Sequence, residues 1–278
     1  MLKGGRKPLE EKFEKLQAYL TELGSVAIAF SGGVDSTFLL YAAKEALGNR
    51  AIAITANSDL FPDREHEEAI SFAKKLQIKQ IIFDVDEFEI DGFSSNPINR
   101  CYLCKKTIFS QIKQLAQEDG VQYVVEGSNM DDNGDYRPGM QAIAELEIKS
   151  PLRVVELYKS EIRELSKRFG LPTWEKPSFA CLASRFVYGE EITKEKLKMV
   201  GAAEQFLLDL GFRQVRVRIH HNLARIETES TEFERLVSRE MREMVNTKFN
   251  ELGFQYVSVD LQGYRTGSMN EVINGKEI

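Results

Sequence analysis

The stretch Ser31-Gly32-Gly33-Val34-Asp35-Ser36 lies between an apolar run at 26–30 and a segment at 37–47 that has the composition of an apolar helix. Its two adjacent glycines allow the backbone to turn tightly and to bring its N–H groups close to an anion. The helix that follows directs the positive end of its dipole to the same place. The two serines add hydroxyl donors, and Asp35 adds a carboxylate that can orient a hydrated Mg²⁺. The stretch therefore predicts a phosphate-binding loop between a buried strand and a helix.

Loop 31–36 is not a Walker A loop, because it lacks the lysine of GxxxxGK[ST]. Without that lysine it suits a pyrophosphate leaving group better than a transferred γ-phosphoryl group. An ordinary tight turn is the alternative, and the complete hexapeptide after a buried strand disfavours it. The motif resembles the PP-loop of the N-type ATP pyrophosphatases, which include GMP synthetase and NAD synthetase. The resemblance implies that ATP is cleaved between its α- and β-phosphates and that an oxygen of the substrate is adenylated.

The composition of the 278-residue chain is that of a soluble protein, with 42% hydrophobic and 29% charged residues. Its net charge of −6 argues against non-specific binding to nucleic acid. No run approaches the ~18 apolar residues of a membrane span, and residues 1–7 contain no apolar signal core. We therefore expect a cytoplasmic protein without a membrane partner.

Apolar runs alternate with helical patterns along the N-terminal part of the chain. Strands are predicted at 26–30, 51–56, 80–85 and 123–126, and helices at 8–23, 37–47, 62–76, 100–118 and 159–169. This order indicates an α/β fold with a doubly wound, mostly parallel sheet, in which ligands bind at the carboxyl ends of the strands. The residues expected to bind ATP there are Ser31, Gly32, Gly33, Asp35, Ser36, Ala56, Asn57, Ser58 and Gly127.

We predict two domains, a PP-loop domain at 1–182 and a smaller α+β domain at 183–278 for substrate binding or oligomerisation. In the second domain, helices are predicted at 193–210 and 231–252 and strands at 215–219, 223–227 and 256–261. The polar connection at 127–139 in the first domain has two interpretations. It is either a solvated loop or a loop whose aspartates bind Mg²⁺ and whose Arg137 meets a phosphate or carboxylate.

The chain has three cysteines, two of them in a CxxC, which favours metal or redox chemistry over a disulfide framework. Cys101 and Cys104 are three residues apart on a predicted helix, so both thiols face the same way, and neighbouring cations such as Lys105 favour thiolates. Cys181 lies in another irregular segment. Three thiolates suit an iron–sulfur cluster with one open iron. Two buried cysteines acting as small hydrophobic residues, or a redox or zinc site, are alternatives that the spacing leaves open.

Several later motifs are more selective than loop 31–36. They are GDYRPG at 134–139, ASRFVYG at 183–189, VRVR at 215–218, ARIE at 224–227 and GYRTGSMN at 263–270. With the PP-loop, they resemble the LarE family of ATP-dependent sulfurtransferases, which act in the synthesis of the nickel-pincer nucleotide. The resemblance implies that pyridinium-3,5-biscarboxylic acid mononucleotide is adenylated on a ring carboxylate. A sulfur nucleophile then displaces AMP and gives a thiocarboxylate.

The resemblance also implies roles for individual residues. One kind of LarE protein sacrifices the sulfur of a single cysteine, and the other uses three cysteines to hold a [4Fe–4S] cluster. Cys101, Cys104 and Cys181 match the second kind, although Cys181 alone as a sacrificial donor stays an alternative. The expected catalytic residues are these three cysteines and Asp35. The residues expected to bind the substrate and its phosphate are Arg137, Ser184, Arg185, Arg216, Arg218, Glu227 and Arg265.

Arg216 and Arg218 alternate along one predicted strand, so they could also lie on a plain solvent-facing side of a sheet. Two other enzyme classes compete with the sulfurtransferase. A tRNA thiolation enzyme would need a basic, aromatic surface for RNA, and an ammonia-using synthetase would have no use for the three thiols. A non-enzymatic nucleotide sensor is a third alternative. Expected partners are the nucleotide substrate, a sulfide donor and further copies of the chain.

Overall fold

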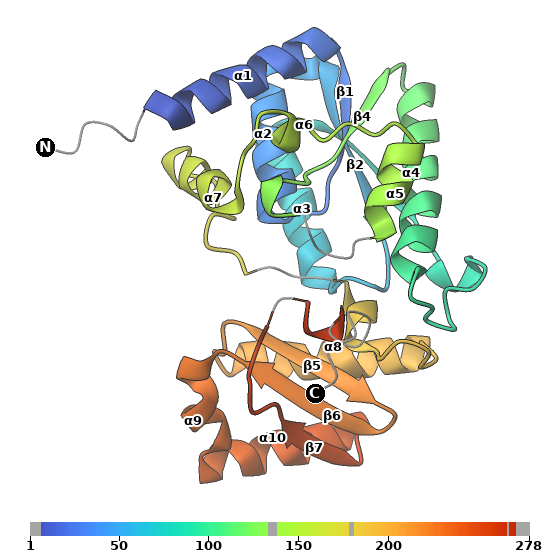
Figure 1. The fold of residues 1–278 in the computed structure, drawn as a ribbon, viewed down its shortest axis with the longest axis vertical. Helices are drawn as coiled ribbons and strands as arrows, with labels where there is room; N and C mark the ends of the chain where they lie inside the picture. The colour runs from blue at the N-terminus through green and yellow to red at the C-terminus, as the bar shows by residue number, and fades with distance from the viewer. Residues whose placement is uncertain (1–6, 133–137, 178–180, 266, 271–278) are drawn as a thin grey trace, which may run out of the picture. The chain divides into compact units, whose positions relative to one another are not determined.

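A computed structural model of the chain describes residues 7–132, 138–177, 181–265 and 267–270. The chain forms two compact units (Figure 1). Unit 1 comprises Met1–Ser58, Pro62–Ile90 and Cys101–Phe179, and unit 2 comprises Asp59–Phe61, Asp91–Arg100 and Ala180–Ile278. The predicted domain division after residue 182 remains a prediction. None of the helices within the described ranges is long and apolar enough to cross a membrane.

Unit 1 is built on a four-stranded sheet in which all neighbouring strands are parallel. The strands are β1 (Val26–Ala29), β2 (Ala51–Asn57), β3 (Lys79–Asp84) and β4 (Tyr123–Val125), in the order β3-β2-β1-β4. The chain first moves from β1 towards β3 and then returns to the other side of β1. The order therefore reverses between β1 and β4, and ligands of open α/β sheets bind at such a point, beyond the carboxyl ends of the strands.

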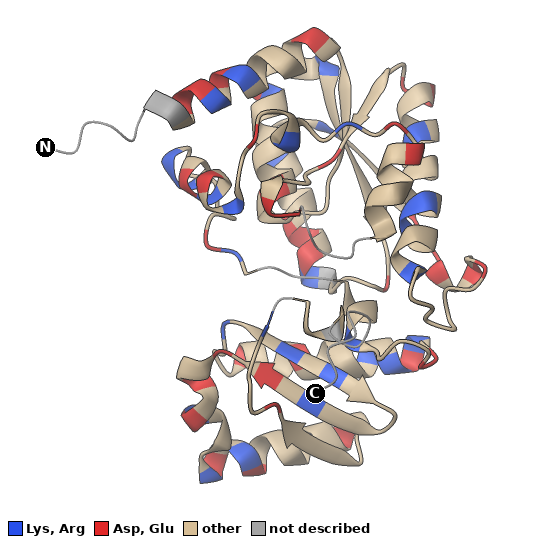
Figure 2. Ribbon diagram, viewed as in Figure 1, with Lys and Arg blue, Asp and Glu red and all other residues tan. Residues whose placement is uncertain are grey.

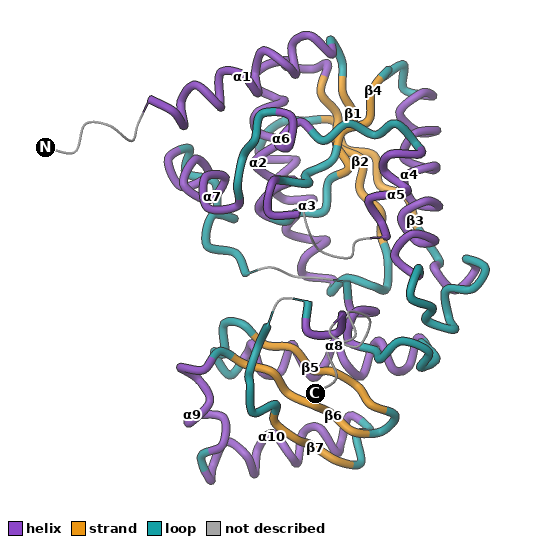
Figure 3. Tube along the Cα trace, viewed as in Figure 1, coloured by secondary structure: helices purple, strands orange, loops and turns teal. Residues whose placement is uncertain are grey.

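Helices cover both faces of this sheet (Figures 1 and 3). One face is covered by α1 (Lys7–Leu23), α2 (Val34–Leu47), α3 (Asp63–Lys75), α6 (Pro151–Val154) and α7 (Lys159–Arg168), and the other by α4 (Arg100–Glu118) and α5 (Pro138–Glu145). Successive side chains of a strand point to opposite faces, so Val26 and Ile28 of β1 join the first core and Ala27 joins the second. The predicted α/β class with a doubly wound parallel sheet is confirmed.

Unit 2 contains a three-stranded mixed sheet in the order β5-β6-β7. Its elements are α8 (Lys194–Asp209), β5 (Val215–His220), β6 (Leu223–Thr228), α9 (Phe233–Val237), α10 (Arg239–Leu252) and β7 (Tyr256–Val259). β5 and β6 are antiparallel, whereas β6 and β7 are parallel. The parallel pair requires a crossover, and α9 and α10 provide it.

Two predictions about helices were wrong. The single helix expected at 231–252 is interrupted at Ser238, whose φ of −56° and ψ of 153° are extended, so α9 ends there and α10 begins. Helices α5 and α6 were not predicted, because the sequence Pro138-Gly139 and the proline Pro151 resemble loop signals. In the structure, both prolines occupy the first turn of a helix, where the missing N–H costs nothing.

Candidate active site

Loop 31–36 connects β1 to α2 at the switch point of the sheet. Gly33 is the N-cap of α2, and no side chain caps the helix. Thr37 N donates to Gly33 O at 2.9 Å, the first bond of the helix. The Oγ atoms of Ser31 and Ser36 lie 3.1 Å apart, and Ser36 Oγ donates to Gly33 O at 3.2 Å. The N–H groups of the first turn are therefore available to a phosphate, as the sequence predicts.

Two glycines allow the backbone segments around this loop to approach one another. Gly32 has a φ of +71°, and a Cβ on it would lie 3.0 Å from Cβ of Ala69 in α3. Gly127 follows β4, and a Cβ on it would lie 3.0 Å from the backbone N of Ser36. A side chain at either position would displace the loop. The structure thus places Gly127 beside the phosphate loop, next to the other residues predicted to bind ATP.

Asp35 occupies the first turn of α2 and forms an ion pair with Lys159 of α7 through its Oδ2 atom. Its Oδ1 atom is buried and accepts no hydrogen bond from any described residue. Burial raises the pKa of this carboxyl, and the neighbouring Lys159 ammonium opposes that rise. A buried carboxylate oxygen without a donor is suited to a hard cation, so the residues present fit Mg²⁺.

The two described aspartates of the connection after β4 accept hydrogen bonds from backbone N–H groups. Asp131 Oδ2 accepts a hydrogen bond from Lys159 N at 2.6 Å, so this carboxylate caps α7. Asp132 Oδ2 accepts from Asn129 N at 2.8 Å, and its negative charge contributes to the raised pKa of Asp35. The expectation that the aspartates of this loop bind Mg²⁺ stays a prediction. Arg137 lies outside the described residues.

The end of β2 supplies the remaining residues predicted to bind ATP. Ala56 and Asn57 end the strand and Ser58 follows it. Asn57 Nδ2 donates to Asp84 Oδ1 at 2.7 Å, and Ser58 Oγ donates to Glu87. These side chains hold the neighbouring strand ends together. A role in recognising adenine would therefore fall to backbone groups, as the sequence predicts, and stays a prediction.

Sequence reasoning missed two lysines at the phosphate loop. Lys159 pairs with Asp35, which is 124 residues earlier in the chain, and Lys176 Nζ donates to Gly32 O, which is 144 residues earlier. Nothing in the local pattern marks either residue. The only available signal is that Lys159 opens a predicted helix, in the same domain as the loop.

The three cysteines are divided between the two units, two in unit 1 and one in unit 2. Cys101 is exposed in the first turn of α4 and Cys104 is half-buried one turn further on, both in unit 1, while the half-buried Cys181 precedes a 3-10 turn of unit 2. None is in a disulfide. Among the described residues, no three His, Cys, Asp or Glu side chains come together as a metal site. The shared site for the three thiols therefore stays a prediction.

The cations next to the CxxC are partly used elsewhere. Arg100 is buried, and its guanidinium donates to Asn96 and, at 2.9 Å, to Ala183 O. Lys106 Nζ donates to Tyr102 Oη at 2.7 Å and to Glu145 at 3.1 Å. Arg100 and Lys106 therefore have other hydrogen-bond partners, and the expectation that neighbouring cations favour thiolates stays a prediction.

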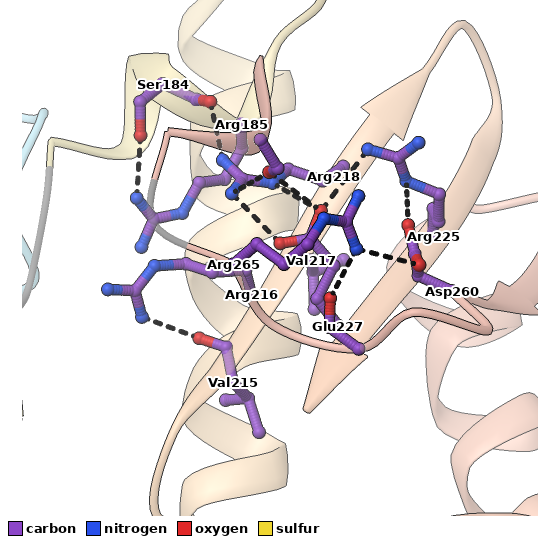
Figure 4. A network of polar contacts seen from close by, with 12 residues as sticks. Ser184, Arg185, Val215, Arg216, Val217, Arg218, Arg225, Glu227, Asp260 and Arg265 are labelled. Carbon is purple, nitrogen blue, oxygen red and sulfur yellow. Dashed lines mark hydrogen bonds and ion pairs between the residues drawn. The ribbon is translucent and has the colours of Figure 1, made fainter. Parts of the chain in front are cut away.

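Five arginines of unit 2 form an arginine cluster, defined as Arg185, Arg216, Arg218, Arg225 and Arg265 (Figure 4). In Figure 2, blue bands mark basic residues on β5 and β6, and red marks the acidic end of β6. Arg218 Nε and Nη2 donate to the two oxygens of Glu227 at 3.1 and 3.0 Å. Arg225 donates to the same carboxylate at 3.3 Å, so Glu227 orients two arginines.

Arg185 is almost fully buried and forms a bidentate ion pair with Glu204 of α8, both N–O distances being 2.8 Å. Its Nη1 donates to Ser184 Oγ at 2.8 Å and to Cys181 O at 3.1 Å. Burial alone would raise the pKa of the Glu204 carboxyl, but the Arg185 guanidinium lowers it below its usual value. The predicted site residues Ser184 and Arg185 therefore fix the backbone at Cys181.

Arg216 is buried next to this pair, with its guanidinium 5.3 Å from the ring centre of Tyr264. Burial and the positive charge of Arg185 lower the pKa of Arg216 to about 10. The alternative in which the arginines of this strand face solvent is wrong, because β5 is buried on both faces. A bound anion would stabilise the charged form of Arg216, and arginine forks match the geometry of phosphate and carboxylate groups.

The edge of the cluster is formed by residues that follow β7. Asp260 lies 3.5 Å from Arg225 Nε and 3.3 Å from Arg265 Nη1. Ser268 Oγ accepts from Arg218 Nη2 at 3.0 Å and donates to Glu227 at 3.2 Å. The structure thus brings together the predicted residues Ser184, Arg185, Arg216, Arg218, Glu227 and Arg265 in unit 2. It adds Arg225 of the ARIE motif, together with Glu204 and Asp260, which were not predicted.

Comparisons with known proteins identify relatives of this chain. The family model of NAD synthase matches residues 9–99, which include the phosphate loop. A glutamine-hydrolysing GMP synthase of Aeropyrum pernix is 26% identical over 212 residues, which are 69% of this chain and 41% of that protein. These matches support membership of the PP-loop superfamily.

Two relatives match over almost their entire length. An uncharacterised protein of Synechocystis sp., slr1717, is 44% identical over 266 residues, 95% of this chain and 99% of that protein. Pyridinium-3,5-bisthiocarboxylic acid mononucleotide synthase of Lactiplantibacillus plantarum is 35% identical over 271 residues, 97% of this chain and 98% of that protein. With the phosphate loop of unit 1 and the arginine cluster of unit 2, these similarities show that the chain belongs to the LarE family of PP-loop proteins.

Proposed function

We propose that the protein is an ATP-dependent sulfurtransferase that acts on pyridinium-3,5-biscarboxylic acid mononucleotide. ATP adenylates a ring carboxylate with loss of pyrophosphate, and a sulfur nucleophile then displaces AMP, so that the oxygen of the carboxylate leaves with AMP and a thiocarboxylate remains. The product would serve the synthesis of the nickel-pincer nucleotide. The observation that carries the proposal is the presence, in one chain, of a phosphate loop at the start of a helix and a cluster of five arginines, three of them buried.

The phosphate loop would bind ATP and stabilise the departing pyrophosphate. Its first-turn N–H groups and the hydroxyls of Ser31 and Ser36, whose Oγ atoms lie 3.1 Å apart, would donate hydrogen bonds to the phosphates. Asp35 would hold Mg²⁺ through Oδ1, and the metal would neutralise charge on the phosphates. Because these donors and cations are already in place, the site needs little reorganisation as negative charge moves to the leaving group.

The arginine cluster would bind the anionic groups of the substrate. The mononucleotide carries a phosphate and two carboxylates, and the protein has a net charge of −6, so its binding surface must be locally positive. Burial and the positive charge of Arg185 lower the pKa of Arg216, so a bound anion would stabilise its charged form. Glu204 and Glu227 keep Arg185 and Arg218 in fixed orientations, which lowers the entropic cost of binding.

The products of a single incubation test this function. With Mg²⁺, ATP, sulfide and the dicarboxylate mononucleotide, we expect AMP and pyrophosphate in equal amounts, together with a thiocarboxylate detected by mass spectrometry. Nicotinic acid mononucleotide, which has a single carboxylate, is the matched control and should react poorly. Replacing sulfide by ammonium should give no amide. A failure to form AMP would contradict the proposal, and an amide product would favour an ammonia-using synthetase.

We further propose that Cys101, Cys104 and Cys181 hold a [4Fe–4S] cluster. Cys101 and Cys104 lie one turn apart at the start of α4, a spacing that suits two thiolate ligands of one cluster. Cys181 is the remaining cysteine, and its backbone carbonyl is fixed by Arg185. When bound, such a cluster would supply the sulfur atom for transfer. A sulfide donor and a homo-oligomeric state stay predictions.

Anaerobic reconstitution with iron and sulfide tests the cluster directly. We expect a broad absorption of bound iron–sulfur in the native protein and an EPR signal after reduction. Replacement of any one cysteine by alanine should remove most of this absorption and should stop multiple turnovers of sulfur transfer. If the native protein binds no cluster and instead loses the sulfur of Cys181 in a single turnover, Cys181 is a sacrificial donor and the cluster proposal is wrong.

A further inference from the structure

Lys176 lies on the outer side of the phosphate loop in unit 1. Its Nζ atom donates to Gly32 O at 3.3 Å and pairs with Glu65 at 2.7 Å and Glu68 at 2.6 Å, both on α3. Only 10% of its side chain is exposed. An ammonium group has three N–H donors, and Gly32 O is the third acceptor of Lys176 beside the two carboxylates.

The contact with Gly32 O fixes the direction of the next N–H group. The peptide bond between Gly32 and Gly33 is trans, so Gly32 C=O and Gly33 N–H point in opposite directions. A carbonyl that faces Lys176 therefore directs the N–H of Gly33 away from Lys176. No described residue accepts a hydrogen bond from that N–H.

The peptide plane needs such an external contact because it lies between two glycines. Glycine populates positive and negative φ almost equally, so rotation of the plane by half a turn costs little in the loop itself. The rotated plane would present a carbonyl oxygen to the phosphates of ATP and would repel them. An ammonium group on the carbonyl oxygen opposes that rotation and also polarises the peptide, which makes its N–H a stronger donor.

The backbone of Lys176 is itself held in place. The guanidinium of Arg163 on α7 donates to Trp174 O at 2.6 Å and to Lys176 O at 2.7 Å. The ammonium of Lys167 lies 4.2 Å from the ring centre of Trp174. Since Lys159 of the same helix pairs with Asp35, α7 positions both cations that contact the phosphate loop.

We propose that Lys176 is a positioning residue for the ATP-cleaving step. It holds the peptide between Gly32 and Gly33 with the N–H directed at the phosphates of ATP, and it contacts the nucleotide only through this peptide. The inference rests on the proposed function, because it requires that ATP binds to the loop.

Variants of Lys176 test the inference in the full chain. Lys176→Met keeps the length of the side chain and removes the ammonium, so the affinity for α,β-methylene-ATP should fall at least about tenfold, the usual effect of losing a charged hydrogen bond. Lys176→Arg retains a donor and should restore most of the affinity. Lys12→Met is the matched control, since Lys12 Nζ also donates to a backbone carbonyl, Glu156 O, and pairs with a carboxylate of Glu161, both at 2.8 Å. It should leave nucleotide affinity within about twofold.

A spectroscopic measurement separates positioning from general stabilisation. In protein labelled with ¹⁵N-glycine, the amide signal of Gly33 should shift when the ATP analogue binds, and Lys176→Met should reduce that shift at saturating analogue. Native affinity in Lys176→Met, or an unchanged Gly33 shift, would overturn the inference. If the native protein does not bind the analogue, the proposed function fails. Because the assay contains no pyridinium substrate, this outcome is separate from a failure of the role proposed for Lys176.

Discussion

Replacement of Asp35 by asparagine should lower the rate of ATP cleavage by about 10²–10³-fold, the usual cost of removing one preorganised electrostatic group from an active site. The native carboxylate pairs with Lys159 through Oδ2, and its Oδ1 is buried without a donor among the described residues. Asparagine keeps the shape and loses the charge, so it would bind Mg²⁺ poorly and would release Lys159. The formation of AMP from ATP and the mononucleotide, followed at saturating Mg²⁺, measures the effect.

The same substitution should leave the fold at least as stable as the native one. Burial raises the pKa of Asp35 above its usual value of 3.8, with Lys159 opposing the rise. The contribution of this carboxyl to stability is therefore fully present below that value and is lost as the pH rises through the folded pKa. The folded protein therefore disfavours the ionised form of this carboxyl, and asparagine removes that cost. Thermal unfolding at pH 7 should give an unchanged or higher midpoint.

Asp131→Asn is the matched control for Asp35→Asn. Asp131 lies near the same strand ends, but its carboxylate caps α7, and asparagine is an equally good cap. This variant should keep near-native ATP cleavage. An Asp35→Asn protein that cleaves ATP at the native rate would remove Asp35 from the catalytic residues. An unfolded Asp35→Asn protein would show that the ion pair with Lys159 is structural.

The parallel sheet could be predicted because the sequence patterns of its strands and helices are local. Short apolar runs alternate with helical patterns, and helix α4 occupies Arg100–Glu118, the range that periodicity predicts. The break between α9 and α10 could not be predicted in this way. Residues on both sides of Ser238 have helical composition, and only the extended conformation of one capping serine separates the two helices.

The candidate site was predictable to the extent that its residues lie in one motif. The phosphate loop is such a motif, and Gly127 could be added because it follows a strand that ends at the same edge. Lys159 and Lys176 reach the loop from 124 and 144 residues away, so no local pattern marks them. Arg216 and Arg218 alternate as in an exposed strand, yet both are buried. Their burial depends on partners from other elements, among them Glu204 and Glu227.

Replacement of Glu204 by glutamine should lower the free energy of unfolding of unit 2 by about 3–5 kcal/mol, the cost of breaking a buried ion pair from one side. Glu204 accepts both guanidinium N–H groups of Arg185 at 2.8 Å and Val217 N at 2.9 Å. Glutamine can accept only part of this set. It leaves Arg185, 1% exposed, as an uncompensated buried charge.

The effect of Glu204→Gln can be assigned to one unit of the full chain. The single tryptophan, Trp174, belongs to unit 1, so its fluorescence during urea unfolding should stay close to native. Amide hydrogen exchange along β5 and β6 reports on unit 2 and should accelerate. The pKa of Glu204 is lowered in the folded protein, so its contribution to stability is fully present above the usual value of 4.5 and is lost as the pH falls through the folded pKa. The difference in free energy of unfolding between Glu204→Gln and the native protein should therefore shrink in acid.

Glu243→Gln provides the comparison with an exposed ion pair. Glu243 pairs with Arg239 at 3.2 Å on α10, and the two side chains are 64% and 85% exposed. Because water already solvates both charges, its loss should cost at most about 0.5 kcal/mol. Equal effects of the two substitutions would mean that burial of Arg185 does not decide the stability of unit 2. A large loss in Glu204→Gln alone, with substrate affinity lost in parallel, would show that one carboxylate on α8 maintains both the packing of β5 and the orientation of the arginine cluster.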